Sequence, residues 1–497
     1  MIRRALSLLA LALVSLSGAA GAQQPVLPSI PQSLSLAEAV DLATRNSPTY
    51  RQVLNDRGPA AWGVRNAYAD FLPSLSVSAS GSYSGSGSQT FGGQNFTQSS
   101  GSLGSSYSLG LNWSFSGSSL MQPGLKKAQL NAVDATTEGA RINLHAGIAQ
   151  QYLNVLQANA LVGLADVQLK RSEEFLRLAQ ARLDVGQATL LDVRRAQVER
   201  GQSEVGVLRA RNAVIVQKLR LFQQMGVPAP DDPTMVTLSD SFPIVEPTWA
   251  LTELLRDAEA QNPDLLSLRA QASAARAGER SAKSAWFPSL SFSAGWSGFT
   301  QQYTNADFLV NRASGSAAAN FQACTVQNQI NTAVGIPTLN CVIFQFTPAM
   351  GDSIRSSNQA FPFDFTTQPF SARFTVSLPI FDQFSRPLQV SEASARTDDV
   401  VEAVRACELF VRAEVSNAYY GLQTAYQTVQ IQETNRTAAQ EQLRLATERY
   451  RVGSGTFYEL LDAQLAAQRA DSDYINAVYD YHKTIAGLES AVGRPLR

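Results

Sequence analysis

The same short pattern occurs twice in this chain of 497 residues, each time within a long stretch that otherwise reads as helix. The first copy, RLDVGQATLLDVRRAQ, occupies residues 182–197, and the second, RYRVGSGTFYELLDAQ, occupies residues 449–464. Both contain Val-Gly followed three residues later by Thr. Because Gly adopts a positive φ at little cost, each Val-Gly predicts a tight turn between two helices. The chain is therefore predicted to contain two helical hairpins of the same design.

The repetition extends far beyond the turns. Tyr152 and Tyr419 are also 267 positions apart, whereas Leu72-Pro73-Ser74-Leu75 precedes its counterpart, Phe287-Pro288-Ser289-Leu290, by only 215 positions. The second half therefore carries about 52 additional residues, which must lie between roughly 297 and 370. We expect a first structural repeat over 23–226, a linker over 227–247 and a second repeat over 248–497.

Two segments of about 60 residues contain almost no helix breakers, and they run from Gly124 to Leu183 and from Pro387 to Tyr450. Sixty helical residues extend for roughly 90 Å, which is too long for an ordinary globule. Shorter helices are expected from Leu36 to about Asp70 and from Thr248 to about Trp286. The long hairpins could form a solvated coiled-coil spacer or the wall of a water-filled tube.

Four segments alternate between large apolar residues and small or polar ones, which is typical of strands with two different faces. They lie at 75–83, 107–115, 290–296 and 370–380. A soluble antiparallel sheet also has one apolar face, but it must bury that face against another layer. Strands of about ten residues with this alternation are typical of outer-membrane barrels, and we favour that interpretation.

Four strands cannot close a barrel, because the smallest bacterial barrels have about eight strands. The barrel must then be shared between copies of the chain: two copies would provide eight strands and three copies would provide twelve. Several chains around one axis also favour the tube over the spacer for the long helices.

The chain begins MIRRALSLLALALVSLSGAAGAQQ, which has a basic start, an apolar run and an Ala-Gly-Ala cleavage site. This predicts a secretory signal peptide over residues 1–22. No later window is apolar enough for a membrane helix. The net charge of −1 indicates no nucleic-acid partner.

Of the three cysteines, Cys324 and Cys341 lie in one polar stretch of the insertion and could pair in an oxidising compartment. We predict that they form a disulfide that closes an exposed loop, and that Cys407 is a buried small residue. Zinc-site, phosphate-loop and nucleophile-elbow motifs are absent from the sequence. We expect no enzymatic activity, no cofactor and no metal site.

The duplicated turns, the plan of strands and long helices, and Ser377-Leu378-Pro379-Ile380-Phe381-Asp382 before a long helix resemble the TolC-type outer-membrane efflux proteins. The resemblance implies an α+β membrane protein: a homotrimer with a twelve-stranded β-barrel, to which each chain gives four strands. A long α-helical barrel of antiparallel coiled-coil hairpins would extend into the periplasm, with the linker in a belt around it. It also implies a passive exit duct in contact with outer-membrane lipid, a periplasmic adaptor protein and an inner-membrane transporter.

The resemblance also assigns roles to individual residues. Asp192 and Tyr450 match positions that hydrogen-bond between the two hairpins, and Glu459 and Asp462 match acidic positions that face the pore at a periplasmic gate. One departure is Gly455, which stands where the family's reference member has an Arg that helps to lock the closed state. The turns would dock the adaptor through Val185, Gly186, Thr189, Leu190, Val452, Gly453, Thr456 and Phe457.

Two cargo classes remain open within this family. The chain could serve the efflux of small molecules such as drugs, or alternatively type I protein secretion, because the inner-membrane partner selects the cargo. A non-transporting envelope spacer is a third alternative, against which the duplicated tips argue.

Overall fold

The computed structural model describes residues 31–92, 94–98 and 100–496, and the expected signal peptide lies outside this range. The chain divides into two compact units. A helical unit comprises the described residues of Met1–Ala60, Ala128–Ala274 and Asp398–Arg497, and a strand unit comprises Ala61–Lys127 and Ala275–Thr397. Several helices contribute residues to both units.

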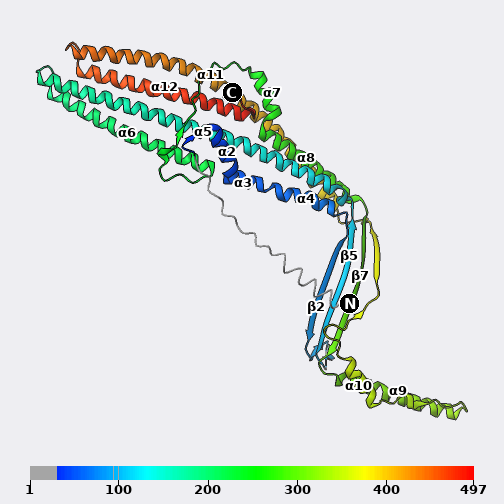
Figure 1. Ribbon diagram of the computed structural model, residues 1–497. Coiled ribbons are helices and arrows are strands. Elements are labelled where there is room, and N and C mark those ends of the chain that lie inside the picture. Colours follow the sequence, from blue (N-terminus) through cyan, green and yellow to red (C-terminus); the bar gives the residue numbers. More distant parts are fainter. Residues whose placement is uncertain (1–30, 93, 99, 497) are drawn as a thin grey trace. The chain divides into compact units, whose positions relative to one another are not determined.

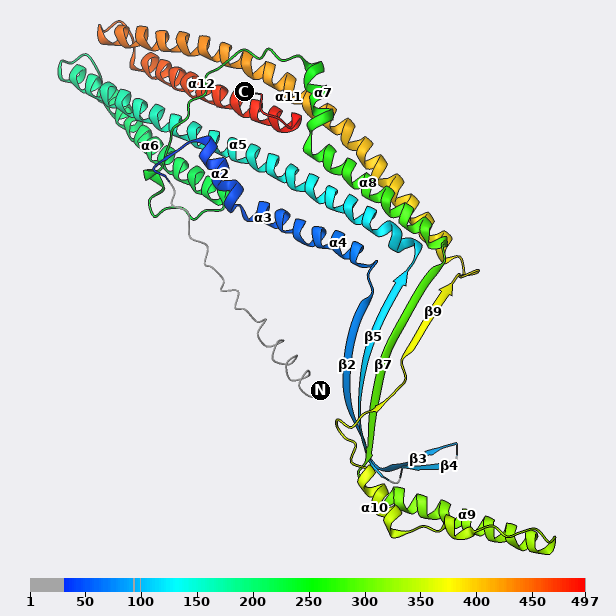
Figure 2. The same ribbon diagram turned by 45° about the vertical axis from the view of Figure 1, so that its right-hand side comes forward.

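The helical unit is built on two antiparallel hairpins, whose four helices lie side by side in Figures 1 and 2. In the first hairpin, α5 (Gly117–Asp184) is followed by α6 (Leu190–Met225), and in the second, α11 (Ser385–Arg451) is followed by α12 (Phe457–Val492). The two long helices thus begin a few residues before the segments expected from the sequence. Pro387 lies in the first turn of α11, where a missing N–H is tolerated, whereas Pro123 lies inside α5, where it removes one backbone hydrogen bond of the helix.

Each hairpin carries a short helix on its side, and the contacts form two similar cores. The helix α2 (Leu36–Asn46) packs on α5 and α6 around Tyr152, which is fully buried and donates its hydroxyl to the carbonyl of Leu34 at 2.9 Å. The helix α7 (Leu251–Gln261) packs in the same way on α11 and α12 around Tyr481 and Leu422. Burial of these apolar side chains at about 25 cal/mol per Å² fixes each short helix to its hairpin.

The two shorter helices expected from the sequence are in fact broken, so the prediction of continuous helices was wrong. The first is divided into α2, α3 (Pro48–Asn55) and α4 (Arg57–Ala69), and the second into α7, α8 (Pro263–Lys283) and the 3₁₀ turn η2 (Ser284–Trp286). One break in each set lies immediately before a proline. Proline lacks an N–H and disfavours helical geometry in the preceding residue, so the chain bends there.

The segment between the two halves is anchored by a buried lysine. It contains the 3₁₀ turn η1 (Pro233–Met235) and β6 (Thr237–Leu238), which pairs in parallel with β1 (Ser33–Leu34). The ammonium of Lys218 on α6 donates to the carbonyls of Pro233 and Val236 at 3.1 and 2.7 Å. Burial lowers the pKa of Lys218, and Asp232 acts in the opposite direction.

The strand unit contains one main antiparallel sheet, in which β2 (Ser74–Ser84) pairs with β5 (Ser102–Phe115), β5 with β7 (Ser289–Tyr303), and β7 with β9 (Ser371–Ser377). A two-residue strand, β8 (Thr366–Thr367), also pairs with β7, and β3 (Gly87–Phe91) forms a separate hairpin with β4 (Gln94–Gln98). The fourth strand was expected to reach Ile380 but ends at Ser377, because Pro379 cannot donate to a ladder.

The two faces of this sheet differ as the alternation predicts. On one face, serines bond across the strands, as between Ser78 and Ser108 at 2.7 Å and between Ser80 and Ser106 at 2.8 Å. On the other face, Leu75, Val77 and Tyr83 are 70, 72 and 68% exposed within a single chain. In the described part of the chain, β2 pairs only with β5 and β9 only with β7, so both edges of the sheet are open.

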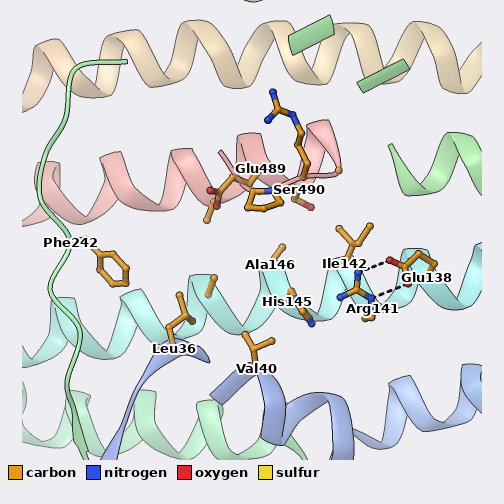
Figure 3. A pocket seen from close by; sticks show the side chains of 15 residues that line it. Leu36, Val40, Glu138, Arg141, Ile142, His145, Ala146, Phe242, Glu489 and Ser490 are labelled. Atoms are coloured by element: carbon orange, nitrogen blue, oxygen red, sulfur yellow. Dashed lines mark hydrogen bonds and ion pairs between the residues drawn. The ribbon is translucent and has the colours of Figure 1, made fainter. Parts of the chain in front are cut away.

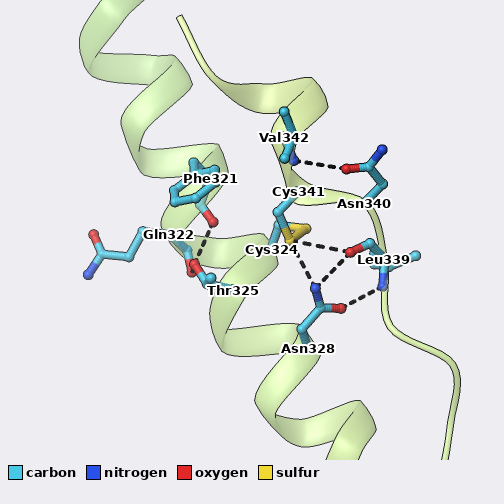
Figure 4. Close-up of a disulfide and its surroundings, with 9 residues drawn as sticks. All are labelled: Phe321, Gln322, Cys324, Thr325, Asn328, Leu339, Asn340, Cys341 and Val342. Carbon is cyan, nitrogen blue, oxygen red and sulfur yellow. Dashed lines mark hydrogen bonds between the residues drawn. A yellow bond between two sulfur atoms is a disulfide. The ribbon is translucent and has the colours of Figure 1, made fainter.

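The insertion of the second half is helical rather than the loop that was expected. It contains α9 (Asp307–Ala333), the 3₁₀ turn η3 (Cys341–Phe344) and α10 (Pro348–Ser357), and α10 lies beside the C-terminal end of β7 in Figure 2. Cys324 of α9 and Cys341 of η3 form a disulfide, with their Cα atoms 5.7 Å apart (Figure 4). The side-chain amide of Asn328 also holds the returning chain, since its oxygen accepts from the N–H of Leu339 at 2.6 Å. Cys407 is a half-buried free thiol on α11. None of the described helices combines the length and apolar character needed to cross a bilayer.

Candidate functional site

The tips of the two hairpins end in the same hydrogen-bonded turn. In the first, the N–H of Gly186 donates to Leu183 at 2.9 Å and that of Gln187 to Arg182 at 2.8 Å. In the second, Gly453 donates to Tyr450 at 3.2 Å and Ser454 to Arg449 at 2.9 Å. This pair of bonds is the Schellman motif, which needs a left-handed residue after the helix. Gly186 and Gly453 provide it, with φ values of 76° and 83°.

The returning helices begin with similar caps. The hydroxyl of Thr189 accepts from the N–H of Asp192 at 3.2 Å, and the Asp192 carboxylate accepts from the Thr189 N–H at 3.0 Å and from its hydroxyl at 2.8 Å. This is a complete capping box. In the second hairpin, the Thr456 hydroxyl accepts from the N–H of Glu459 at 3.2 Å, but the Glu459 carboxylate forms an ion pair with Arg449 at 3.6 Å.

The two hairpins pack against each other just behind their tips. Apolar residues from all four helices form one buried cluster there, in which the Tyr450 ring lies 5.7 Å from that of Phe457. The other buried members of the cluster are Phe175, Ala179, Val193, Ala196, Leu443, Leu460, Ala463 and Ala467. The position of one tip is therefore coupled to that of the other within a single chain.

The expected hydrogen bond between Tyr450 and Asp192 does not form in the structure. The Asp192 carboxylate caps its own helix, and the buried hydroxyl of Tyr450 has no hydrogen-bond partner among the described residues. Burial raises the pKa of Tyr450, Arg182 opposes this shift, and the negative charge of Asp192 adds to it.

A residue that the sequence analysis did not select, Arg182, joins the tips instead. Its guanidinium lies over the Tyr450 ring, with Cζ 4.4 Å from the centroid. Nη1 donates to the carbonyl of Tyr450, and Nη2 donates to the carbonyl of Gln187 at 3.1 Å. The repeat contained a signal for this residue, since an Arg stands four positions before the turn glycine in both copies.

The two proposed pore acids, Glu459 and Asp462, are both exposed in the single chain. Glu459 lies 3.6 Å from Arg449, with side chains 47 and 60% exposed, so solvent screens this ion pair strongly. Gly455 bonds to the end of α11 through its N–H, which reaches the carbonyl of Arg449 at 3.0 Å. A Cβ at Gly455 would come within 3.1 Å of the Cβ of Arg449, so the turn has little room for a side chain here.

The residues expected to dock an adaptor are exposed at the tips, with one exception. Val185, Leu190 and Val452 are 67, 59 and 74% exposed, and the docking glycines and threonines, Gly186, Thr189, Gly453 and Thr456, are exposed as well. Phe457 is instead buried in the tip cluster, being only 6% exposed. The apolar side chains next in sequence, Leu191 and Tyr458, were not predicted as docking residues but are 57 and 70% exposed.

A buried carboxylate ties the hairpins together farther from the tips. Asp471 on α12 is 4% exposed and accepts from Arg436 at 2.9 Å and from Gln440 at 2.8 Å, both on α11. It also accepts from Arg171 on α5, at 3.4 Å. These bonds connect three helices at one point.

An open cavity of about 710 Å³ lies between α5, α12 and α2 (Figure 3). Three of its charged side chains are already paired: Glu138 with Arg141 at 2.5 Å, and Arg494 with Asp257, outside the lining, at 2.6 Å. Burial lowers the pKa of its single histidine, His145. In the described part of the chain, no three potential metal ligands cluster here or elsewhere.

An α+β chain with an open-edged sheet, an exposed apolar face and paired helical hairpins has the features of an outer-membrane channel protein. The profile described as outer membrane efflux protein matches residues 39–227 and 254–494. The chain therefore belongs to the outer membrane efflux protein family. This confirms the family resemblance seen in the sequence and the predicted location in the outer membrane.

Individual relatives agree with this assignment. The chain is 24% identical over 469 residues to outer membrane protein TolC of Escherichia coli (strain K12), covering 94% of this chain and 83% of the relative. A membrane protein from Pseudomonas aeruginosa has a similar structure, with a TM-score of 0.68 and 21% identity over 94% of this chain and 92% of that one. The open state of the Neisseria gonorrhoeae MtrE outer membrane channel gives a TM-score of 0.65 at 20% identity, covering 93% and 89% of the two chains.

Proposed function

We propose that this protein is the passive exit duct of a tripartite export system, assembled from three copies in the outer membrane. Each copy gives the four long strands of its sheet to a twelve-stranded barrel, and its two hairpins join those of the other copies in a helical tunnel that extends into the periplasm. The match of the family profile to two separate segments supports the twofold internal repeat behind this plan.

The observation that carries the proposal is the sheet with two open edges and one exposed apolar face. Unpaired N–H and C=O groups of β2 and β9 cannot remain in lipid, where each unsatisfied group costs several kcal/mol. Pairing β2 of one copy with β9 of the next satisfies both edges and turns Leu75, Val77 and Tyr83 toward lipid.

The hairpin tips are the surface that fits an adaptor. Each has an exposed apolar side chain at its Val-Gly turn and another on the returning helix. Three copies would arrange six such tips in a ring, with Glu459 and Asp462 of each copy at its opening. A periplasmic adaptor that contacts this ring would link the duct to an inner-membrane transporter.

The assembly is tested on the purified full-length mature protein in mild detergent. Light scattering should give three times the protomer mass, and planar bilayers should show discrete channels. A stable monomer that retains full β-structure, or a protein that forms no channels, would contradict the proposed duct.

As the transport role we propose the efflux of small molecules, with type I protein secretion as the alternative; the family is described as outer membrane efflux protein. Deletion of the gene should then increase the susceptibility of the cells to drugs or other toxic compounds. Loss of a secreted protein with unchanged susceptibility would favour the secretion channel instead.

A further inference from the structure

Arg182 and Arg449 occupy the same position in the two copies of the turn, four residues before the glycine. The backbone carbonyl of each accepts the closing bond of its turn. Their side chains behave differently. Arg449 is exposed and remains on its own hairpin, near Glu459. Arg182 is only 9% exposed, because its side chain crosses to the other hairpin.

The Arg182 side chain contacts the backbone of both hairpins as well as the side chain of Tyr450. One end of its guanidinium donates to Gln187 in the first turn, and the other donates to Tyr450 at the end of α11. The face of the group lies on the Tyr450 ring, an arrangement that is attractive for a cation. A planar guanidinium can bridge two carbonyls in this way, whereas a lysine ammonium cannot present the same fork.

The groups that the family resemblance predicts between the tips make no contact there in this chain. Asp192 caps the first residues of α6, the Tyr450 hydroxyl has no hydrogen-bond partner among the described residues, and Gly455 has no side chain. Among the described residues, Arg182 supplies the polar contact between the two turns.

The burial of the Arg182 guanidinium opposes this contact. The guanidinium has no carboxylate within ion-pair distance in the described part of the chain, and its buried Nε donates to nothing there. A buried charge without a counter-ion is costly, and an arginine cannot become neutral. Separation of the tips would lose the carbonyl and ring contacts but would restore water to the guanidinium.

We propose that Arg182 is the latch that holds the two hairpin tips of each chain together in the closed duct. It acts by positioning Tyr450 and the end of α11 against the first turn. This inference rests on the proposed duct and its gate, and it replaces the expected bond between Tyr450 and Asp192.

The test compares Arg182→Met with Arg449→Met, its counterpart in the repeat. Both changes remove one arginine from the same position of the same turn, but only the first removes a contact between hairpins. Spin labels at Gln187→Cys and Ser454→Cys, both exposed, report the separation of the tips in a Cys407→Ser background. Labelled chains are diluted with unlabelled ones so that distances within one chain dominate.

We expect Arg182→Met to lengthen and broaden the distance between the labels and to make cells several-fold more sensitive to vancomycin, with Arg449→Met unchanged in both measurements. Arg182→Lys, which keeps the charge, should give intermediate label distances and intermediate sensitivity. If Arg182→Met fails to assemble, the result for Arg182→Lys tests the latch. Unchanged label distances in the Arg182 variants would overturn the latch, and so would equal changes in Arg182→Met and Arg449→Met. Failure of the parent protein to form channels in bilayers would instead overturn the duct.

Discussion

Arg182 lies with its guanidinium carbon 4.4 Å from the centre of the Tyr450 ring, although 268 positions separate the two residues in sequence. The contact uses the ring and the backbone carbonyl of Tyr450, and it leaves the phenolic hydroxyl without a partner among the described residues. The family resemblance had assigned the tip contact to that hydroxyl. The two arrangements lead to opposite expectations for simple variants.

Tyr450→Phe should leave the duct closed, because the ring and the carbonyl remain. It should not lower the thermal stability of the trimer, since it removes a buried hydroxyl that lacks a partner. Tyr450→Ala should destabilise the tip by about 3–5 kcal/mol and make cells sensitive to vancomycin, because it removes a large buried ring. Tyr458→Phe is the exposed control. If the Tyr450→Phe variant leaks, the hydroxyl of Tyr450 holds the tips in the parent protein, as the hydrogen bond to Asp192 would.

The double variant Glu459→Ala with Asp462→Ala should reduce the cation selectivity of the channel and abolish block by trivalent cations. In the proposed trimer these residues place six carboxylates around one opening, and like charges 4 Å apart repel by about 1 kcal/mol in water. Arg449 lies 3.6 Å from Glu459, so Arg449→Ala should increase cation selectivity. Reversal potentials in a salt gradient measure both effects. If all variants keep the selectivity of the parent, Glu459 and Asp462 do not face the pore.

Replacing both Cys324 and Cys341 by Ser should loosen the helical insertion without affecting transport. The disulfide closes a segment with a sequence separation of 17, for which chain entropy predicts roughly 3 kcal/mol of stabilisation. Limited proteolysis should then cut the variant within the insertion while the trimer and its conductance remain unchanged. Thiol labelling of the parent without reductant is the accompanying check, and labelling of both residues would show that they are not paired.

Asp471→Ala should lower the thermal stability of the trimer more than Asp471→Asn does. The alanine variant leaves Arg171, Arg436 and Gln440 without their shared acceptor, whereas asparagine retains one oxygen. The two arginine side chains are 30 and 42% exposed, so water offsets part of the loss and we expect about 1–3 kcal/mol for alanine. The ion pair of the exposed Asp480 with Lys483 provides the control, since Asp480→Ala should have almost no effect. An equal loss for both alanine variants would argue against a structural role for Asp471.

The elements that follow from local periodicity could be predicted from the sequence. Alternation of apolar and small residues identified β2, β5, β7 and β9, because side chains on a strand point to opposite faces in turn. The two turns were equally predictable, because their bonds join residues that are three and five positions apart in sequence. Local rules also explain the two helix breaks that were not predicted. At Pro48 and Pro263 the proline disfavours helical geometry in the residue before it, so one helix ends there and the proline begins the next.

Local rules could not predict which side chains contact one another at the hairpin tips. By sequence alone Arg182 and Arg449 are equivalent, and so are Asp192 and Glu459, which stand at the same position after their turns. The family resemblance predicted Phe457 at the surface, but its side chain is buried in the tip cluster.

The sequence by itself determined the repeat, the strands, the long hairpins and the turns, because each depends on backbone geometry and on neighbours along the chain. Only the tertiary structure decided that Arg182 crosses to Tyr450 while Arg449 stays in solvent. That difference depends on the rotation and axial offset of two helices more than 200 residues apart, which are set by the packing of the buried tip cluster between them. A shift of one helix by a single turn would change which side chains meet while leaving every local pattern intact.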